Sequence, residues 1–252
     1  MLSQAQVEQY HRDGYVVPDY RVSSAVLDSI KARHAALVER KPEFRDYCPA
    51  LLDQDPGFFD YCNDPAILDM VEQLIGHDIA LWNSSFFAKP AYNGRRTPWH
   101  QDGEYWPITP LATCTVWLAV DASTRQNGCL QVIEGSHRDQ RLRKHNSTDA
   151  TDVNLNQELD ASEYDEARAR YIELEPGQIS LHDVYLLHGA DANVSPQSRR
   201  GMTMRFMPTT SHFDRALASA KSRAMNITDH AERPVYLMRG IDRCGKNRFI
   251  NA

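Results

Sequence analysis

The short segment Trp99-His100-Gln101-Asp102 contains residue types that could bind a metal ion. Residues i and i+2 of an extended segment lie on one face, so His100 and Asp102 would present an imidazole and a carboxylate to the same ion. His188 follows 88 residues later (188 − 100) and could supply a second imidazole. Two histidines and one carboxylate, with open positions opposite them, suit non-haem Fe(II). These residues therefore predict an iron site whose open positions take O2 and a co-substrate.

His182 is the competing candidate for the third ligand. It has the same strand parity as His188 in the segment ISLHDVYLLH, so both rings could point inward, although Asp183 offers it a local partner. We favour His188 because a glycine follows it and a basic pair lies downstream. The other histidines show no ligand spacing and are expected at the surface, in turns or in the core. They are His11, His34, His77, His137, His145, His212 and His230.

Arg199 and Arg200 follow His188 by eleven and twelve residues. A turn through residues 193–198 and a returning strand would bring one of the two arginines toward the metal. A fixed guanidinium binds the distant carboxylate of a dicarboxylate through paired hydrogen bonds. The alternative interpretation is an arginine pair on the surface, and the turn together with the metal ligands argues against it.

The elements that must position these residues fall into two groups. Helical periodicity and capping residues predict helices at residues 3–14, 23–41 and 64–76, with Ser3 and Asp64 as N-caps and Gly14 and Gly76 at the ends. From residue 78 the sequence changes to short strands separated by turns, which is typical of a sandwich, barrel or jelly roll. The predicted strands lie within 78–90, 112–121, 129–137, 171–175, 179–188 and 199–209.

The composition excludes several classes of protein. The chain has 252 residues, 42% hydrophobic, and a net charge of −6, with one short basic cluster at 141–145, so a nucleic-acid partner is not expected. No apolar stretch is long enough to cross a bilayer, and residues 1–14 lack the apolar centre of a secretory signal. The five cysteines form no CxxC pair and indicate neither a disulfide framework nor a zinc site. We therefore expect a cytoplasmic protein with reduced thiols.

Three segments resemble the phytanoyl-CoA dioxygenase (PhyH) family of Fe(II)- and 2-oxoglutarate-dependent oxygenases. They are HQD at 100–102, NGCLQVIEGSH at 127–137 and LLHGADANVSPQSRRG at 186–201. FFAKP at 86–90, TVWLAVD at 115–121 and the first helix followed by DGYVV fit the same pattern, so the resemblance covers roughly residues 5–210. It implies a mainly β fold with flanking helices, the cupin-like jelly roll or double-stranded β-helix. The chain would then be a single domain, with a helical flank at about 1–77, a core at about 78–210 and an extension at about 211–252.

The resemblance also implies roles for individual residues. His100, Asp102 and His188 would be the iron ligands, and Arg199 would anchor 2-oxoglutarate, with Arg200 as the alternative. Further residues would assist near the co-substrate or substrate: Trp117, Asn83, Ser85 and Ser195. Aromatic residues beside the metal motif would line the substrate pocket or, equally, pack in the core: Trp99, Tyr105 and Trp106. Asn127 and Gly128 read as a structural turn.

The implied reaction hydroxylates an unactivated C–H bond while 2-oxoglutarate and O2 are converted to succinate and CO2. The carboxylate at Asp102 favours hydroxylation over chlorination, because related halogenases have a small residue there. The expected substrate is a small metabolite, such as an amino acid, a betaine-like compound, an alkylphosphonate or a secondary-metabolite intermediate. Trp99, Tyr105 and Trp106 could hold a cation by their π faces. Arg239, on a predicted strand near the pocket, could instead hold an anion, or that strand could simply pack.

Two other functions remain open from the residues alone. The first is a non-catalytic metal- or ligand-binding protein of the same fold, which need not retain all four of His100, Asp102, His188 and Arg199. The second is a jelly-roll metal enzyme that does not use 2-oxoglutarate, in which Arg199 would have no task. The polar segment 139–169 could be a mobile loop over the site or a surface insertion, and the sequence does not indicate an oligomeric state.

Overall fold

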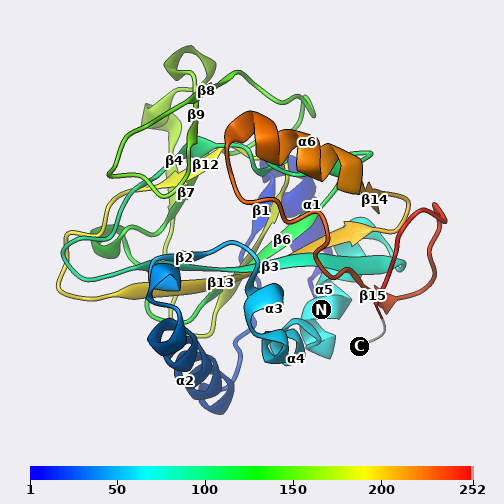
Figure 1. Cartoon of the computed structure of the whole chain (residues 1–252), viewed down its shortest axis with the longest axis horizontal. Coiled ribbons are helices and arrows are strands. Elements are labelled where there is room, and N and C mark those ends of the chain that lie inside the picture. Colours follow the sequence, from blue (N-terminus) through cyan, green and yellow to red (C-terminus); the bar gives the residue numbers. More distant parts are fainter. Residues whose placement is uncertain (251–252) are drawn as a thin grey trace.

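The computed structural model describes residues 1–250 and contains two main antiparallel β-sheets with helices on the outside (Figure 1). The larger sheet has the order β1-β11-β6-β13-β3-β15, and β2 also pairs with β3. Its strands are β1 (Tyr15–Val16), β2 (Tyr47–Cys48), β3 (Ile79–Lys89), β6 (Cys114–Ala119), β11 (Ile179–Asp183), β13 (Arg199–Pro208) and β15 (Tyr236–Arg239). The smaller sheet has the order β10-β7-β12-β4. Its strands are β4 (Thr97–His100), β7 (Leu130–Val132), β10 (Arg170–Ile172) and β12 (His188–Ala190).

Alternation along the strands of the large sheet separates a packed core from an inner cavity. On β13, Met202 and Met204 belong to the main hydrophobic core, whereas Arg199, Thr203 and Arg205 on the other face line a cavity. The apolar face packs against the helices, and the polar face looks toward the smaller sheet, whose residues line the same cavity. The mainly β fold with flanking helices predicted from the sequence is therefore confirmed.

The helices begin and end close to the predicted residues. Those of the N-terminal flank are α1 (Gln4–Asp13), α2 (Ser24–Arg40), α3 (Leu51–Gln54), α4 (Phe59–Cys62) and α5 (Pro65–Ile75). The side chains of Ser3, Ser23 and Asp64 accept hydrogen bonds from backbone N–H groups of the first turns of α1, α2 and α5. Gly14 ends α1 with φ of 88°, a conformation that favours glycine. The three helices predicted at 3–14, 23–41 and 64–76 are confirmed.

One sequence prediction about the strands was wrong. The run 179–188 is not a single strand, because the chain turns between Asp183 and His188 and passes from β11 in the large sheet to β12 in the small one. β12 pairs with β4 and β7, so His188 lies opposite both His100 and Val132. The turn places His182 and His188 on opposite walls of the same interior, and their ring centroids are 5.1 Å apart.

The polar insertion at 139–169 and the C-terminal extension also have defined structure. The insertion at 139–169 forms a hairpin of β8 (His145–Ser147) and β9 (Gln157–Leu159). Beyond the core, β14 (His212–Phe213) pairs with β5 (Ile108–Thr109), helix α6 (Arg215–Met225) follows, and β15 joins the edge of the large sheet beside β3 (Figure 1). No helix within residues 1–250 has the length and apolar character needed to cross a membrane.

Candidate metal centre and adjoining cavities

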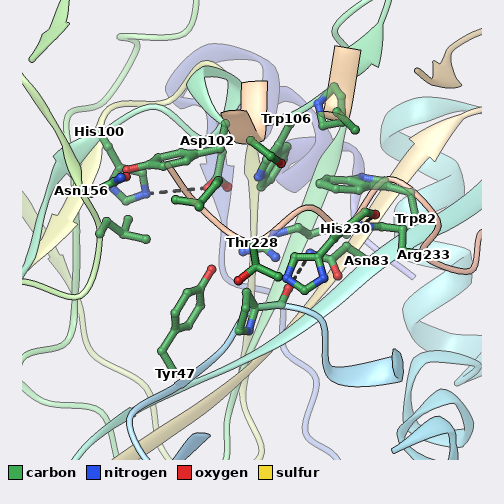
Figure 2. A pocket seen from close by; sticks show the side chains of 18 of the residues that line it. Tyr47, Trp82, Asn83, His100, Asp102, Trp106, Asn156, Thr228, His230 and Arg233 are labelled. Atoms are coloured by element: carbon green, nitrogen blue, oxygen red, sulfur yellow. Dashed lines mark hydrogen bonds and ion pairs between the residues drawn. The ribbon is translucent and has the colours of Figure 1, made fainter. Parts of the chain in front are cut away.

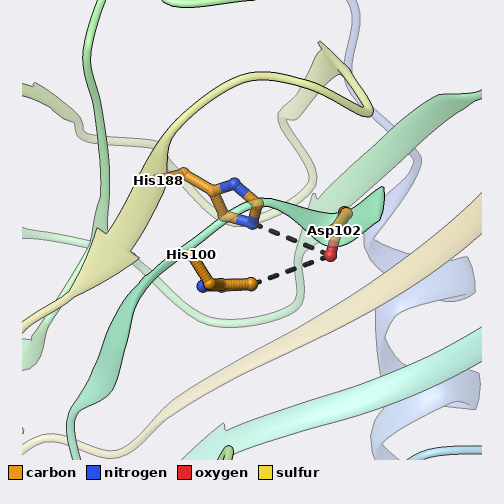
Figure 3. Close-up of side chains that lie close together, drawn as sticks. All are labelled: His100, Asp102 and His188. Carbon is orange, nitrogen blue, oxygen red and sulfur yellow. Dashed lines mark ion pairs between the residues drawn. The ribbon is translucent and has the colours of Figure 1, made fainter. Parts of the chain in front are cut away.

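His100, Asp102 and His188 meet between the two sheets (Figure 3). One ligand atom from each lies within 4.8 Å of the others, with His100 Nε2 at 3.7 Å and His188 Nε2 at 3.9 Å from Asp102 Oδ1. His100 comes from the end of β4, Asp102 from the turn that follows, and His188 from β12, so the β4–β12 pairing brings together residues 88 positions apart. All three side chains are buried.

The hydrogen bonds of both imidazoles leave the atoms needed for metal binding free. The Nδ1–H of His100 donates to Pro98 O at 2.8 Å, and the Nδ1–H of His188 donates to Leu186 O at 2.9 Å. A carbonyl can only accept, so in each ring Nε2 keeps its lone pair and points at Asp102. The donor set therefore fits a resident Fe(II) ion, with two neutral imidazoles and one carboxylate on the same side.

The electrostatics of the site favour the same protonation states. Burial alone would raise the pKa of Asp102, but the facing imidazoles of His100 and His182 hold this pKa well below its ordinary value. Burial, followed by the neighbouring His100, holds the pKa of His188 well below that of a free histidine. The Asp102 carboxylate is thus ionised and the His188 imidazole is neutral, and these are the forms that bind a metal.

His182 approaches the site without joining the ligand set. Its Nε2 is 3.6 Å from Asp102 Oδ2, the oxygen opposite the one that faces the other two histidines. Its buried Nδ1 has no hydrogen-bond partner among the described residues. His182 thus lies on the Oδ2 side of the carboxylate, away from the other two histidines. The strand parity that made it an alternative to His188 reflects this inward position.

An inner cavity extends from the metal ligands to Arg199, which is buried and forms no ion pair within the described residues. Its guanidinium donates to Gly128 O at 2.7 Å, lies 5.2 Å from the Trp117 ring centroid, and leaves Nε without a partner. A Cβ at Gly201 would come within 2.2 Å of the Trp117 ring, so only glycine leaves room for this indole. Burial lowers the pKa of Arg199 to about 10. An unpaired buried cation beside the metal ligands fits the distant carboxylate of 2-oxoglutarate.

Arg200 and Ser195 are directed elsewhere. The Arg200 guanidinium forms a two-pronged ion pair with Asp121, at 2.7 and 2.9 Å, on the opposite face of β13 from Arg199. The Ser195 hydroxyl donates to Asn193 Oδ1 at 2.8 Å inside the turn before β13, and Ser195 lines neither cavity. The Ser195 hydroxyl is therefore used in the turn that leads to Arg199, and no hydrogen bond joins it to that guanidinium in the described residues.

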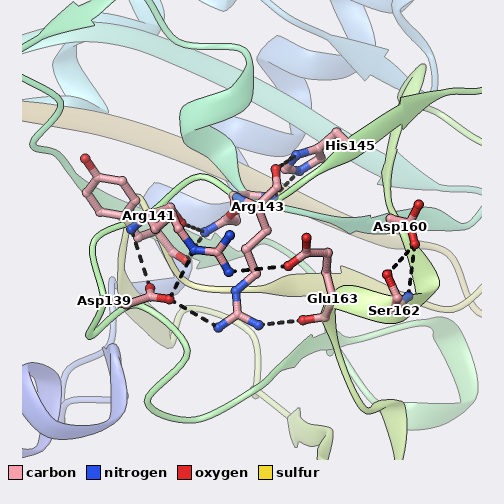
Figure 4. A network of polar contacts seen from close by, with 9 residues as sticks. Asp139, Arg141, Arg143, His145, Asp160, Ser162 and Glu163 are labelled. Atoms are coloured by element: carbon pink, nitrogen blue, oxygen red, sulfur yellow. Dashed lines mark hydrogen bonds and ion pairs between the residues drawn. The ribbon is translucent and has the colours of Figure 1, made fainter.

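The insertion holds the metal motif from behind through Gln101, which is fully buried. The Gln101 side-chain amide donates to Arg141 O at 2.9 Å and Tyr185 O at 2.8 Å, and its carbonyl accepts from the backbone N–H of Arg143 at 2.7 Å. Around this point, charged side chains of the insertion form a network, which includes Arg141 and Glu163 at 3.5 Å (Figure 4). The basic cluster at 141–145 thus supports the segment between two metal ligands.

An outer cavity of about 420 Å³ opens on the other side of the metal ligands (Figure 2). It shares Phe87, His100, Asp102 and Arg205 with the inner cavity, so the two cavities meet at the metal site. The walls include three segments outside the predicted motifs: 154–156 of the insertion, the α6 face with residues 226–228, and His230 with Arg233. The sequence motifs therefore do not identify most of the residues that line this outer cavity.

The predicted aromatic residues divide between this cavity and the core. Tyr105 and Trp106 line the outer cavity. Trp99 lines neither cavity; it packs in a separate cluster beside Tyr164, and its Nε1 donates to Glu166 at 3.2 Å. The prediction of Trp99 as a substrate residue is wrong because its side chain points away from His100, its neighbour in the strand.

The remaining predicted residues, Asn83, Ser85 and Arg239, also lie in different surroundings. Asn83 lines the outer cavity, and its amide donates to Pro49 O at 3.1 Å. Ser85 lines neither cavity, but its hydroxyl accepts from Arg205 at 2.5 Å and so supports a residue that lines both. Arg239 is ion-paired with Asp69 and Glu72 on α5, at 2.7 and 2.6 Å, which contradicts its prediction as an anion site at the pocket.

Comparison with known proteins gives a consistent family match. A family model described as phytanoyl-CoA dioxygenase (PhyH) matches residues 10–201. A Caenorhabditis elegans protein named probable phytanoyl-CoA dioxygenase is 28% identical over 236 residues, which cover 82% of this chain and 75% of that protein. The peroxisomal phytanoyl-CoA dioxygenase of Homo sapiens is 30% identical over 159 residues, 60% of this chain and 46% of the human protein. The chain thus matches less than half of the human relative's length.

A solved structure supports the fold. The structure of ThoJ in its apo form, described as a non-heme monooxygenase, superposes with a TM-score of 0.73 and covers 97% of this chain and 86% of its own. The identity is 23%, so the likeness concerns the fold. Together with the two sheets, it confirms the predicted double-stranded β-helix.

Proposed function

The chain belongs to the phytanoyl-CoA dioxygenase (PhyH) family of Fe(II)- and 2-oxoglutarate-dependent oxygenases, and from this premise we propose that it hydroxylates an unactivated C–H bond of a small metabolite. We propose His100, Asp102 and His188 as the iron ligands and Arg199 as the anchor of 2-oxoglutarate. The single observation that carries the proposal is that the three ligands and the unpaired Arg199 line one buried cavity. An enzyme without 2-oxoglutarate would leave this guanidinium without a counter-ion, and a non-catalytic binding protein need not retain all four residues.

In this mechanism the protein positions the reactants and excludes water. Bound iron and 2-oxoglutarate would supply the oxidising chemistry, in which O2 is consumed, succinate and CO2 leave, and a C–H bond becomes an alcohol. His100, Asp102 and His188 occupy one side of the metal position and leave the other side to the reactants. Arg199, stacked on Trp117, fixes one end of 2-oxoglutarate, while His100 and Asp102 also border the outer cavity, where the substrate C–H bond would lie.

The outer cavity supports a small substrate. Its volume of about 420 Å³ lies within the roughly 300–1,000 Å³ of ordinary small-molecule sites. An amino acid, a betaine-like compound, an alkylphosphonate and a secondary-metabolite intermediate all remain candidates by size. The carboxylate of Asp102 fills the position that a halide would need, which supports hydroxylation as the outcome.

We further propose that residues 1–252 form one oxygenase domain, because β1 from the N-terminal flank and β15 from the C-terminal extension are both strands of the large core sheet. A cytoplasmic location is supported by the five cysteines, which form no disulfide in the described structure. No nucleic-acid or membrane partner is expected from a net charge of −6.

The test is an anaerobic titration of the protein with Fe(II) and then 2-oxoglutarate. Chelation of the co-substrate at an open Fe(II) site should produce a weak visible charge-transfer band at roughly 500 nm. His188→Ala should abolish the band, and Arg200→Gln, which lies outside the cavity, should retain it. A wild-type protein that is fully loaded with iron and shows no band would contradict the proposal. A panel of small metabolites scored by succinate release would then identify the substrate.

A further inference from the structure

Two further guanidinium groups, those of Arg205 and Arg233, line the outer cavity. Figure 2 labels Arg233 among the lining side chains. Arg205 lies on β13 and is 5% exposed, while Arg233 lies between α6 and β15. Neither forms an ion pair with any carboxylate of residues 1–250. Arg205 is buried and Arg233 is partly buried, so both lose hydration that an opposite charge would have to compensate.

Aromatic rings lie close to both guanidiniums. Arg205 lies 4.9 Å from the Trp106 ring centroid, and Arg233 lies 5.6 Å from that of Trp82 and 5.5 Å from that of Phe213. Trp82 and Trp106 pack edge to face at 4.9 Å, so the two arginines flank one aromatic cluster. Stacking uses the faces of the guanidiniums and leaves their N–H edges for a ligand.

Hydrogen bonds within the protein use only part of these edges. Arg205 donates from one terminal nitrogen to Ser85 Oγ, and its buried Nε has no partner. Arg233 donates from Nε to His230 O at 3.1 Å, and its two terminal nitrogens have no hydrogen-bond partner in the described residues. Several fixed donors therefore remain free in a cavity that borders the metal ligands.

The charges around the cavity do not neutralise the arginines. Burial lowers the pKa of Arg233 to about 10; the charge of Asp53 opposes this shift, and the nearby charge of Arg205 adds to it. Asp53 itself faces His230, at 3.7 Å. The carboxylate of Asp102 also lines the cavity, and it would be bound to the proposed metal. The cavity therefore has an excess of positive charge.

We propose that the substrate carries a terminal oxyanion group, a carboxylate or a phosphonate, which Arg233 and Arg205 bind in the outer cavity. This inference rests on the proposed function, because it requires the C–H bond to react at the His100–Asp102–His188 site. Arg199 already provides a separate anchor for 2-oxoglutarate in the inner cavity. Arg205 borders both cavities, whereas Arg233 lines only the outer one, so Arg233 distinguishes the substrate from the co-substrate.

The same geometry makes a cationic substrate unfavourable. The guanidinium of Arg205 already lies over the ring of Trp106, the aromatic residue that would otherwise be available to a quaternary amine. A second cation would be repelled by both arginines. With the oxyanion held at Arg233 and Arg205, the oxidised carbon would be separated from the anionic end of the substrate.

The test uses the anaerobic protein saturated with Fe(II) and 2-oxoglutarate. Straight-chain compounds of four to eight carbons are titrated calorimetrically, each as the carboxylate, the phosphonate, the primary alcohol and the primary amine. We expect at least one anionic series to bind at least tenfold more tightly than the alcohol and amine of the same length. The better of the two anionic series identifies the chemical source of the oxyanion.

The variant Arg233→Gln should weaken binding of that series at least tenfold while leaving the 2-oxoglutarate titration unchanged within twofold. Arg239→Gln, with the same loss of charge at an ion pair outside the cavity, is the matched control and should bind the anions as the wild type does. Thermal unfolding separates the roles, because a purely structural Arg233 would lower the melting temperature of the variant, and an unpaired ligand-binding cation would not. Absence of anion preference, or an Arg233→Gln variant with wild-type affinity, overturns this inference; absence of the 2-oxoglutarate band overturns the proposed function instead.

Discussion

The two cavities that meet at the metal ligands differ in how they are built. The inner cavity is formed mainly by strands of the two core sheets, and strand pairing places most of its polar side chains, as with His188 opposite His100. The outer cavity takes much of its wall from the insertion at 139–169 and the segment after residue 211, whose lining residues lie mostly in loops and in helix α6. The rigid inner wall suits chemistry that requires fixed positions, and the outer wall is where a different substrate could be accommodated.

The difference also concerns charge. Arg199 in the inner cavity forms an ion pair with no carboxylate of the described residues. Arg205 and Arg233, which line the outer cavity, also form none. Both cavities are therefore prepared for anions, and they are separated by the metal ligands. Substitutions in the inner cavity should therefore weaken binding of 2-oxoglutarate and spare the substrate, and substitutions in the outer cavity should do the reverse.

The largest expected effect is on the metal site. Asp102→Ala removes the carboxylate that faces both imidazoles, and we expect iron affinity to fall by more than about 100-fold, since even outer hydrogen-bond partners of metal ligands contribute roughly 10–100-fold. Anaerobic equilibrium dialysis with Fe(II) measures this loss. Asp160→Ala, which removes a carboxylate on the insertion, should bind iron normally. Wild-type iron affinity in Asp102→Ala would show that the three side chains do not form the metal site.

The next effect concerns the two neighbouring arginines. Arg199→Gln should weaken 2-oxoglutarate binding by roughly 10–100-fold, because charge-assisted hydrogen bonds are each worth about 1.5–3 kcal/mol. Arg200→Gln breaks the partly exposed pair with Asp121 and should change this affinity less than about twofold. The visible band of the iron complex, titrated with 2-oxoglutarate, measures both. Equal effects of the two substitutions would remove the distinction between the faces of β13.

The sequence predicted the inner cavity well for a physical reason. Period-two alternation places His100 and Asp102 on one side, and the family motif identifies His188 and Arg199, so few residues suffice. The outer wall carries no such spacing: Arg233 stands in an irregular segment, and its position depends on how residues 226–235 pack against Trp82. For Trp99 the sequence leaves pocket lining and core packing equally open, and Trp99 packs in the core because alternation directs it away from its strand neighbour His100.

Gln101 tests whether the two regions are independent. Its amide links the metal motif to the backbone of Arg141 and Arg143 in the insertion, so Gln101→Leu would leave buried backbone groups unsatisfied and loosen the segment between two ligands. We expect iron affinity to fall roughly tenfold, as for an outer partner of a metal site. Glu163→Gln, at the exposed edge of the same network, is the matched control and should bind iron as the wild type does. Unchanged iron affinity in Gln101→Leu would mean that the core strands alone position the motif.

The smallest effect is expected within the outer wall. The Asn156 amide donates to Met225 O at 2.8 Å and connects the insertion hairpin to the end of α6, so Asn156→Ala should lower the free energy of unfolding by about 1 kcal/mol. Amide hydrogen exchange should become faster at 148–157 and 222–228, while the affinity for 2-oxoglutarate stays unchanged, because Arg199 and its strand are untouched. Asn146→Ala, which removes an exposed bond to Asp160 in the same hairpin, should leave exchange in α6 as it is. A loss of 2-oxoglutarate affinity in Asn156→Ala would contradict the separation of the cavities, since it would show that the outer wall also maintains the inner one.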